Sequence, residues 1–145
     1  MAFFVSSGII YLMIKTKKIK KPTIGKLGKL LWIECKRIVR ATYIKQNGTW
    51  DCFTCGRCID EPSKAQTGHF LPSSVCGAFL RYDLRNLRIQ CYNCNINAGG
   101  AGAMYYQNLV KEKGQDHVDQ IMKDKQKIIK AYDHFEMILQ EYKNL

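Results

Sequence analysis

Apolar residues recur at steps of three and four positions between residues 25 and 45, at Leu27, Leu31, Cys35 and Ile38. This spacing places the four side chains on one face of a helix and leaves the remaining surface to the basic residues of the segment. We therefore expect a long amphipathic helix over residues 25–45.

The last third of the chain predicts further helices. Residues 104–110 have the pattern of a short helix, Gly114 breaks it, and residues 116–122 begin another. Apolar residues then continue at heptad-like spacing, at Ile128, Tyr132, Phe135, Leu139 and Tyr142. Such a stripe is typical of core packing, and the alternative is that the helix over residues 128–142 forms a dimer surface.

The middle of the chain predicts short strands inside an insertion. A turn at Asn47-Gly48 leads into the first of two C-x-x-C pairs, and 35 residues separate the pairs, whereas a simple zinc ribbon needs about 15–20. The insertion contains Gln66–Phe70, a loop at Pro72–Ser74, and two apolar runs, Phe79–Tyr82 and Leu84–Ile89. We expect two short strands around an irregular loop.

Four of the seven cysteines form the two pairs, Cys52/Cys55 and Cys91/Cys94. Each C-x-x-C places two thiolates on one tight turn, and two such turns complete the tetrahedral shell of a structural Zn²⁺ that is closed to water. Cys58 could substitute, because Cys55-x-x-Cys58 has the same spacing. The odd count and irregular positions argue against a secreted disulfide framework and favour a reducing, cytoplasmic compartment.

The net charge of +11 is concentrated in residues 15–45, which hold eleven Lys or Arg and one acidic residue. A block of like charge beside a folded unit is typical of an arm that binds nucleic acid, and a solubilising tail is the alternative.

Residues 1–14 are mostly apolar, but a membrane-spanning helix needs about 20 residues, and the segment lacks the features of a signal peptide. Either they precede a true start at Met13 or they pack on the domain. We divide the chain into an apolar start and basic arm, residues 1–24, and a single domain, residues 25–145, with no membrane partner expected.

Linked motifs in and around the insertion resemble a nuclease family. They are Cys52–Gly56, Gly68–Phe70, Leu80–Asn86 and Gln90–Asn95. Together they resemble the zinc-stapled branch of the HNH (ββα-metal) endonucleases and, more closely, the phage NinG/Rap family of recombination endonucleases, over about residues 30–122. The resemblance implies an α+β fold in which a small ββα-metal core is inserted between two zinc knuckles and flanked by N- and C-terminal helices.

The resemblance also implies an activity, that of a metal-dependent DNA endonuclease acting on branched DNA such as Holliday junctions and D-loops. His69 would be the general base that deprotonates the attacking water, whereas the other two histidines, His117 and His134, are expected at the surface. Asn86 would pin the loop between the strands by backbone hydrogen bonds. Asn95 would bind one catalytic Mg²⁺ or Mn²⁺, which stabilises charge on the phosphate and the departing oxygen.

Two positions depart from the family pattern. Gly68 stands where many HNH enzymes have a metal-binding Asp, although the related phage family also has Gly here, so activity is not excluded. The carboxylate must then come from elsewhere, and we expect Asp83 to supply it. Alternatively, His69 is itself a metal ligand and another group activates the water. Ala101 stands where the family commonly has Asn, which leaves open a slow or inactive site.

Basic side chains are expected to contact DNA phosphates, both near the site and along the arm. They are Arg81, Arg85, Arg88, Lys17, Lys18, Lys20, Lys21, Lys36, Arg37 and Arg40. A phage origin would place the protein in the host cytoplasm, and resolution of a junction by paired nicks would imply a homodimer. The alternatives are a non-catalytic zinc-containing DNA-binding protein with a degenerate HNH site and a protein directed to RNA.

Overall fold

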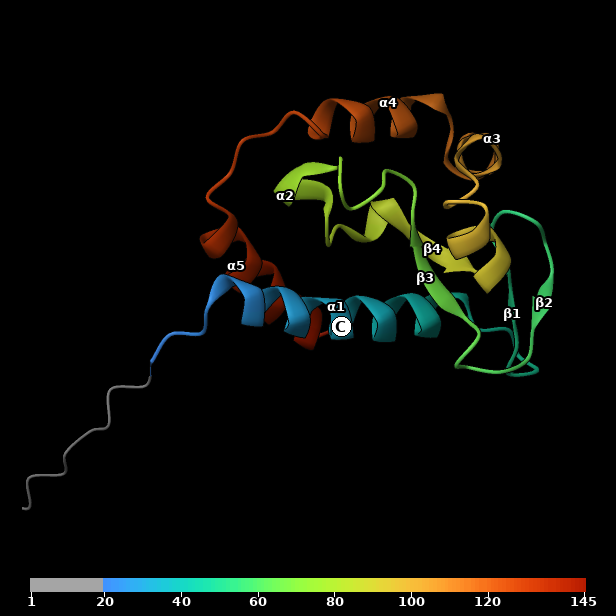
Figure 1. Ribbon diagram of the computed structural model, residues 1–145, viewed down its shortest axis with the longest axis horizontal. Helices are drawn as coiled ribbons and strands as arrows, with labels where there is room; N and C mark the ends of the chain where they lie inside the picture. The colour runs from blue at the N-terminus through green and yellow to red at the C-terminus, as the bar shows by residue number, and fades with distance from the viewer. Residues whose placement is uncertain (1–19) are drawn as a thin grey trace, which may run out of the picture.

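The structure, a computed structural model, describes residues 20–145 as a mixture of helices and two small antiparallel sheets (Figure 1). The predicted α+β class is therefore confirmed. In chain order the elements are α1 (Ile24–Tyr43), β1 (Trp50–Asp51), β2 (Cys58–Ile59), β3 (Gln66–His69), α2 (Gly77–Leu80), the 3₁₀ turn η1 (Leu84–Asn86), β4 (Leu87–Gln90), the π-helical turn η2 (Asn93–Asn97), α3 (Gly102–Lys113), α4 (Gln115–Asp124) and α5 (Ala131–Lys143). None of the described helices is long and apolar enough to cross a membrane.

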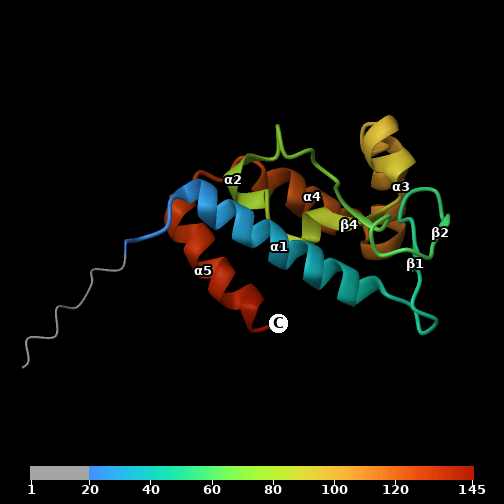
Figure 2. The same ribbon diagram turned by 60° about the horizontal axis from the view of Figure 1, so that its bottom comes forward.

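Helix α1 confirms the predicted amphipathic helix and forms the base on which the other elements pack. The side-chain hydroxyl of Thr23 accepts a hydrogen bond from the backbone N–H of Lys26 at 3.3 Å and so caps the first turn. The predicted apolar stripe, from Leu27 to Ile38, is buried. Helix α5 crosses this buried face, and the two sheets lie toward the other end of α1 (Figure 2).

The two sheets are separate hairpins. In the first, Trp50 pairs with Ile59 and Asp51 with Cys58. In the second, β3 and β4 run antiparallel with His69 opposite Leu87. The two predicted strands of the insertion are therefore present. Part of the segment between them is helical: Phe79 and Leu80 lie in α2, and Leu80 is fully buried.

Two apolar cores lie on either side of the β3–β4 hairpin. The first joins α1 and α5 to the sheets, and the second lies among α2, α3 and α4. Three residues of the predicted C-terminal stripe, Phe135, Leu139 and Tyr142, belong to the first core, so that stripe packs within the chain. Its expected first member does not: Ile128 is 99% exposed, because α5 begins only at Ala131.

Candidate active site and metal centre

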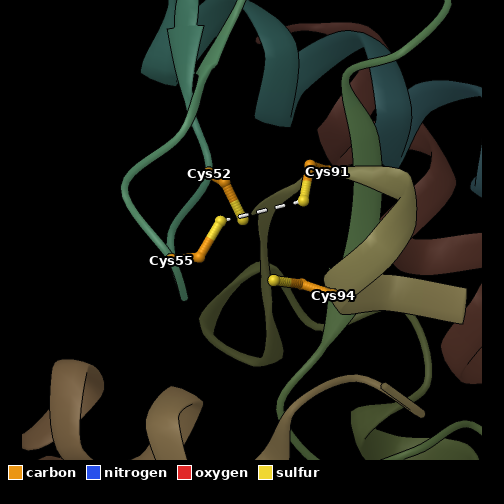
Figure 3. A group of neighbouring side chains, drawn as sticks. All are labelled: Cys52, Cys55, Cys91 and Cys94. Atoms are coloured by element: carbon orange, nitrogen blue, oxygen red, sulfur yellow. Dashed lines mark hydrogen bonds between the residues drawn. The ribbon is translucent and has the colours of Figure 1, made fainter. Parts of the chain in front are cut away.

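The four paired cysteines come together as predicted. Their sulfur atoms all lie within 4.8 Å of one another, and the Sγ atoms of Cys55 and Cys91 are 3.8 Å apart. Four sulfurs at the corners of a tetrahedron with Zn–S bonds of about 2.3 Å would be about 3.8 Å apart. The side chains of Cys52, Cys55, Cys91 and Cys94 turn toward a common centre (Figure 3). The cluster could therefore hold a metal ion such as zinc.

The four thiols differ in acidity before any metal binds. Burial alone would raise the pKa of Cys52, but hydrogen bonds from the backbone N–H of Cys55 and from Thr54 outweigh burial and lower this pKa to about 6. Burial raises the pKa of Cys94 to about 12. A cation that binds all four sulfurs must therefore displace protons, and its affinity is expected to rise with pH.

Cys58 does not belong to this cluster. It lies in β2, is exposed, and pairs along the backbone with Asp51 in β1. Cys52 and Cys55 instead lie in the loop between β1 and β2, and their side chains face Cys91, which follows β4, and Cys94 in η2 (Figure 3). The metal centre thus joins two segments that are 35 residues apart in the chain.

A cleft of about 920 Å³ opens between α1, β3, α2 and the first turns of α5. Its lining includes three residues of the predicted site, His69, Asn95 and Arg81. The lining contains two basic side chains, Lys29 and Arg81, and, within residues 20–145, no Asp or Glu. The cleft is therefore suited to a negatively charged ligand.

His69, the predicted general base, is held in one orientation by two contacts. Its Nε2 lies 3.0 Å from the backbone carbonyl oxygen of Arg81, and its ring stacks on Trp32 with centroids 5.2 Å apart and an interplanar angle of 8°. A carbonyl oxygen can only accept a hydrogen bond, so Nε2 carries the hydrogen and Nδ1 is the basic nitrogen of the neutral ring.

The electrostatics of the site keep His69 neutral. Burial lowers its pKa below the ordinary 6.5; the hydrogen bond to the Arg81 carbonyl opposes this effect, and the positive charge of Arg81 adds to it. At neutral pH the imidazole is therefore unprotonated at Nδ1 and able to accept a proton.

Asn86 holds the loop between β3 and β4. Its side chain is fully buried; Oδ1 accepts the N–H of Leu71 at 2.8 Å, and Nδ2 donates to the carbonyls of Leu71 at 3.0 Å and Leu80 at 3.3 Å. The backbone carbonyl of Asn86 also accepts the N–H of Phe70 at 2.8 Å. These bonds fix both ends of the segment that runs from His69 to Arg81.

Asn95 lies in η2, immediately after the last cysteine of the cluster. Its Nδ2 donates to Oε1 of Gln66 in β3 at 2.8 Å, which ties the metal centre to the strand that carries His69. With Nδ2 engaged, Oδ1 is the atom of Asn95 that can act as a ligand in the cleft.

Three residues of the predicted site lie elsewhere. The Asp83 carboxylate binds the Arg85 guanidinium, with Nε 3.1 Å from each oxygen, and Asp83 does not line the cleft. Arg85 also binds Asp124 at 2.8 Å, so two carboxylates balance its charge. Arg88 is 3% exposed, binds Glu112 at 2.8 Å and packs between two aromatic rings, so the structure assigns it to the core instead of to a phosphate contact.

The surroundings of Gly68 and Ala101 bear on both departures. A Cβ on Gly68 would overlap the side-chain amide of Gln90, with Cδ only 2.6 Å away, so an Asp cannot stand there without displacing Gln90. Ala101 has a φ of 49°, in the left-handed region that Asn adopts more readily than Ala. The Asn common in the family therefore suits the backbone at this position whether or not it binds a ligand.

The basic residues predicted to bind DNA have varied surroundings. Lys17 and Lys18 lie outside the described residues, and Lys20 and Lys21 are exposed. On α1, Arg37 binds Glu34 at 2.8 Å, Arg40 binds the Ala65 carbonyl at 3.1 Å, and Lys36 is half-buried. None of the three lines the cleft.

Among the cleft residues that sequence reasoning missed, Lys29, Trp32 and Thr67 matter most for the site. Thr67 could have been found, because it stands two positions before His69 in a strand and so shares its face. Lys29 and Trp32 gave no such signal, since only the packing of α1 against β3 brings them to His69.

His117 also differs from its prediction as a surface group. Its Nε2 is buried and has no hydrogen-bond partner among residues 20–145. His134 is half-buried and stacks on Phe79, with ring centroids 5.2 Å apart.

Comparison with known proteins gives one match. A protein-family model described as "Bacteriophage Lambda NinG protein" matches residues 14–145. Searches of curated proteins and of solved structures gave no significant match.

Proposed function

Because the chain belongs to the bacteriophage lambda NinG protein family, we propose that it is a DNA endonuclease of the HNH type that uses His69 as its general base. The observation that carries the proposal is a neutral imidazole, anchored through Nε2, in a cleft with two basic side chains. The proposal extends to branched substrates, such as Holliday junctions and D-loops, as the resemblance to recombination endonucleases implies.

The proposed architecture is a ββα-metal core. The β3–β4 hairpin would be its two strands and the turn η2 the start of its helical part, with the four-cysteine centre joining them from outside. Zinc would act only structurally there, because four thiolates leave no open position for water.

The chemistry proposed for His69 follows from its tautomer. Nδ1 takes a proton from water, the water oxygen forms a bond to phosphorus, and the bond from phosphorus to the leaving sugar oxygen breaks. The departing oxygen takes up a proton from solvent. Arg81 and Lys29 would reduce the negative charge that builds up on the phosphate oxygens.

A divalent cation, Mg²⁺ or Mn²⁺, is part of the proposal inherited from the resemblance. Such ions prefer oxygen ligands and commonly use substrate phosphates with one or two carboxylates. The cleft offers Oδ1 of Asn95 but, within the described part of the chain, no carboxylate, so the cation would have to be held largely by the substrate's own oxygens. Its contribution when bound would be to stabilise charge on the phosphate.

The test is cleavage of end-labelled four-way junctions, D-loops, nicked duplexes and linear duplexes by zinc-loaded protein in Mg²⁺ or Mn²⁺. We expect wild type to cut the branched substrates and His69→Ala to lose about 10²–10⁴-fold in rate. His134→Ala is the matched control, because His134 lies outside the cleft and should leave cleavage unchanged. Equal cutting by wild type and His69→Ala would remove His69 from the mechanism.

The second candidate is a non-catalytic, zinc-containing DNA-binding protein, and the absence of a carboxylate from the cleft lining within residues 20–145 favours it. It predicts tight junction binding, weakened by salt, with no cutting in either metal. An RNA junction in the same assay tests whether the substrate is DNA alone. Paired nicking of a junction would further require a homodimer, which analytical ultracentrifugation with and without DNA would detect.

A further inference from the structure

Thr67 carries a buried hydroxyl that nothing in the described chain satisfies. The residue is 6% exposed, and within residues 20–145 its Oγ1 has no hydrogen-bond partner. Buried hydroxyls nearly always have a partner, because leaving one unpaired costs free energy. An orphaned hydroxyl in a ligand cleft therefore suggests that the ligand supplies the missing partner.

The surroundings of Thr67 place it beside the proposed base. Thr67 and His69 are two positions apart in β3, so their side chains leave the strand on the same face, and both residues line the cleft. His69 stacks on Trp32 of α1. Lys29 lies three positions before Trp32 on the same helix face and also lines the cleft.

The charge of the cleft decides what the hydroxyl binds. Lys29 and Arg81 line it, and no described lining residue is acidic. Residues 1–19 contain no Asp or Glu either, so the N-terminal segment cannot supply a carboxylate. A hydroxyl that bound a cation would still need an acceptor for its hydrogen, whereas a phosphate oxygen is itself that acceptor.

The cleft has room for such an anion, since its volume is about 920 Å³. Gly25 in the first turn of α1 lines it, and an added Cβ there would meet nothing within 4 Å, so the cleft is open beside this residue. The lining thus combines room for a phosphate with donors on both sides of it.

We propose that the Thr67 hydroxyl donates a hydrogen bond to a non-bridging oxygen of a phosphodiester held in the cleft by Lys29 and Arg81. This proposal deepens the proposed endonuclease function, because it names a substrate-binding group of the same site. Its test needs no cleavage, so the two can fail separately.

The test is phosphate-dependent thermal stabilisation of zinc-loaded protein, measured with inorganic phosphate at constant ionic strength and without added Mg²⁺ or Mn²⁺. Thr67→Val removes the hydroxyl at nearly constant shape, and Thr67→Ser retains it. We expect Thr67→Val to weaken phosphate binding about tenfold and Thr67→Ser to bind like wild type. Lys29→Ala should also weaken binding, whereas Lys113→Ala, at the far end of α3 and outside the cleft, should not.

A second readout separates a binding role from a structural one. Without phosphate, Thr67→Val should be at least as stable as wild type, because it replaces an unpaired hydroxyl with a methyl group. A Thr67→Val protein that melts lower would show that the hydroxyl already has a partner and would overturn the proposal. Equal phosphate binding by wild type and Thr67→Val, or none by wild type, would also overturn it.

Cleavage assays on the same proteins distinguish the two proposals. Hydroxyl-dependent phosphate binding by a protein that cuts no DNA would uphold the role of Thr67 and refute the endonuclease. Cleavage that depends on His69, together with phosphate binding that is unchanged in Thr67→Val, would support the endonuclease and refute the role of Thr67.

Discussion

Replacing Asn86 with Ala should destabilise the protein strongly, because the amide satisfies buried backbone groups on both sides of a loop. In the variant, the N–H and the carbonyl of Leu71 both lose the partner that Asn86 provides. The carbonyl of Leu80 keeps a second hydrogen bond, from the N–H of Asp83 at 3.2 Å, and loses less.

The size of the effect follows from that count. Each buried group left unpaired costs about 1–3 kcal/mol, so two such groups and the lost packing predict a fall of about 3–5 kcal/mol in the free energy of unfolding. This is a large share of the about 5–15 kcal/mol by which small domains are stable. His69 and Arg81 border the loop, so any cleavage should fall even at temperatures where the variant is folded.

Urea unfolding of zinc-loaded protein, followed by far-UV circular dichroism, measures the change. Asn97→Ala is the matched control: Asn97 is exposed and its Nδ2 bonds only the neighbouring Asn93 side chain, so it should cost less than about 0.5 kcal/mol. A loss below about 1 kcal/mol for Asn86→Ala would refute the reasoning, since the backbone groups would then have found other partners.

Three further predictions concern the scaffold. Ala101→Gly should raise the free energy of unfolding by about 1 kcal/mol, because Gly adopts the left-handed conformation of residue 101 without strain. Ala103→Gly, at an exposed position of helix α3, should instead lower it by about 0.5–1 kcal/mol, and changes of the same sign for both in urea unfolding would contradict this. Burial alone would raise the pKa of Asp124, but hydrogen bonds from Lys127, Arg85 and Gln120 lower it from 3.8 to about 2, so Asp124→Asn should cost about 2 kcal/mol at pH 7. That difference should shrink as pH falls from about 4 toward 2, and a difference independent of pH would argue against the ion pairs. Zinc-loaded protein should show one fast-reacting thiol, the exposed Cys58, and chelation should release the four clustered thiols as well; four or more fast thiols before chelation would count against the metal centre.

The sequence predicted correctly those elements that depend on residues close together in the chain. Helix α1 could be read from its apolar stripe, and the break between α3 and α4 from Gly114, whose φ of 88° suits glycine. The four-cysteine cluster could be read from spacing, because each C-x-x-C is a single turn. The start of α5 could not, since Ile128 continues the stripe in sequence while the chain at that point lies in a loop.

The candidate site is formed by segments that are far apart in the sequence, so only some of its residues could be predicted. His69 and Asn95 share a cleft, but Asp83 is bound by a neighbouring arginine, and Arg88 is drawn into the core by Glu112, 24 residues further along the chain. Composition alone cannot tell an arginine with a buried acidic partner from one that faces a ligand. Likewise, the stacking of Trp32 on His69 exists only because α1 crosses β3.

The most direct test of the central claim, that a neutral His69 accepts the proton of the attacking water, is the pH dependence of single-turnover cleavage of a labelled four-way junction. Because burial lowers the pKa of His69, the rate should rise with pH as the ring loses its proton, with a midpoint below 6.5, and level off near neutrality. A rate whose midpoint lies at or above pH 6.5 would contradict the account.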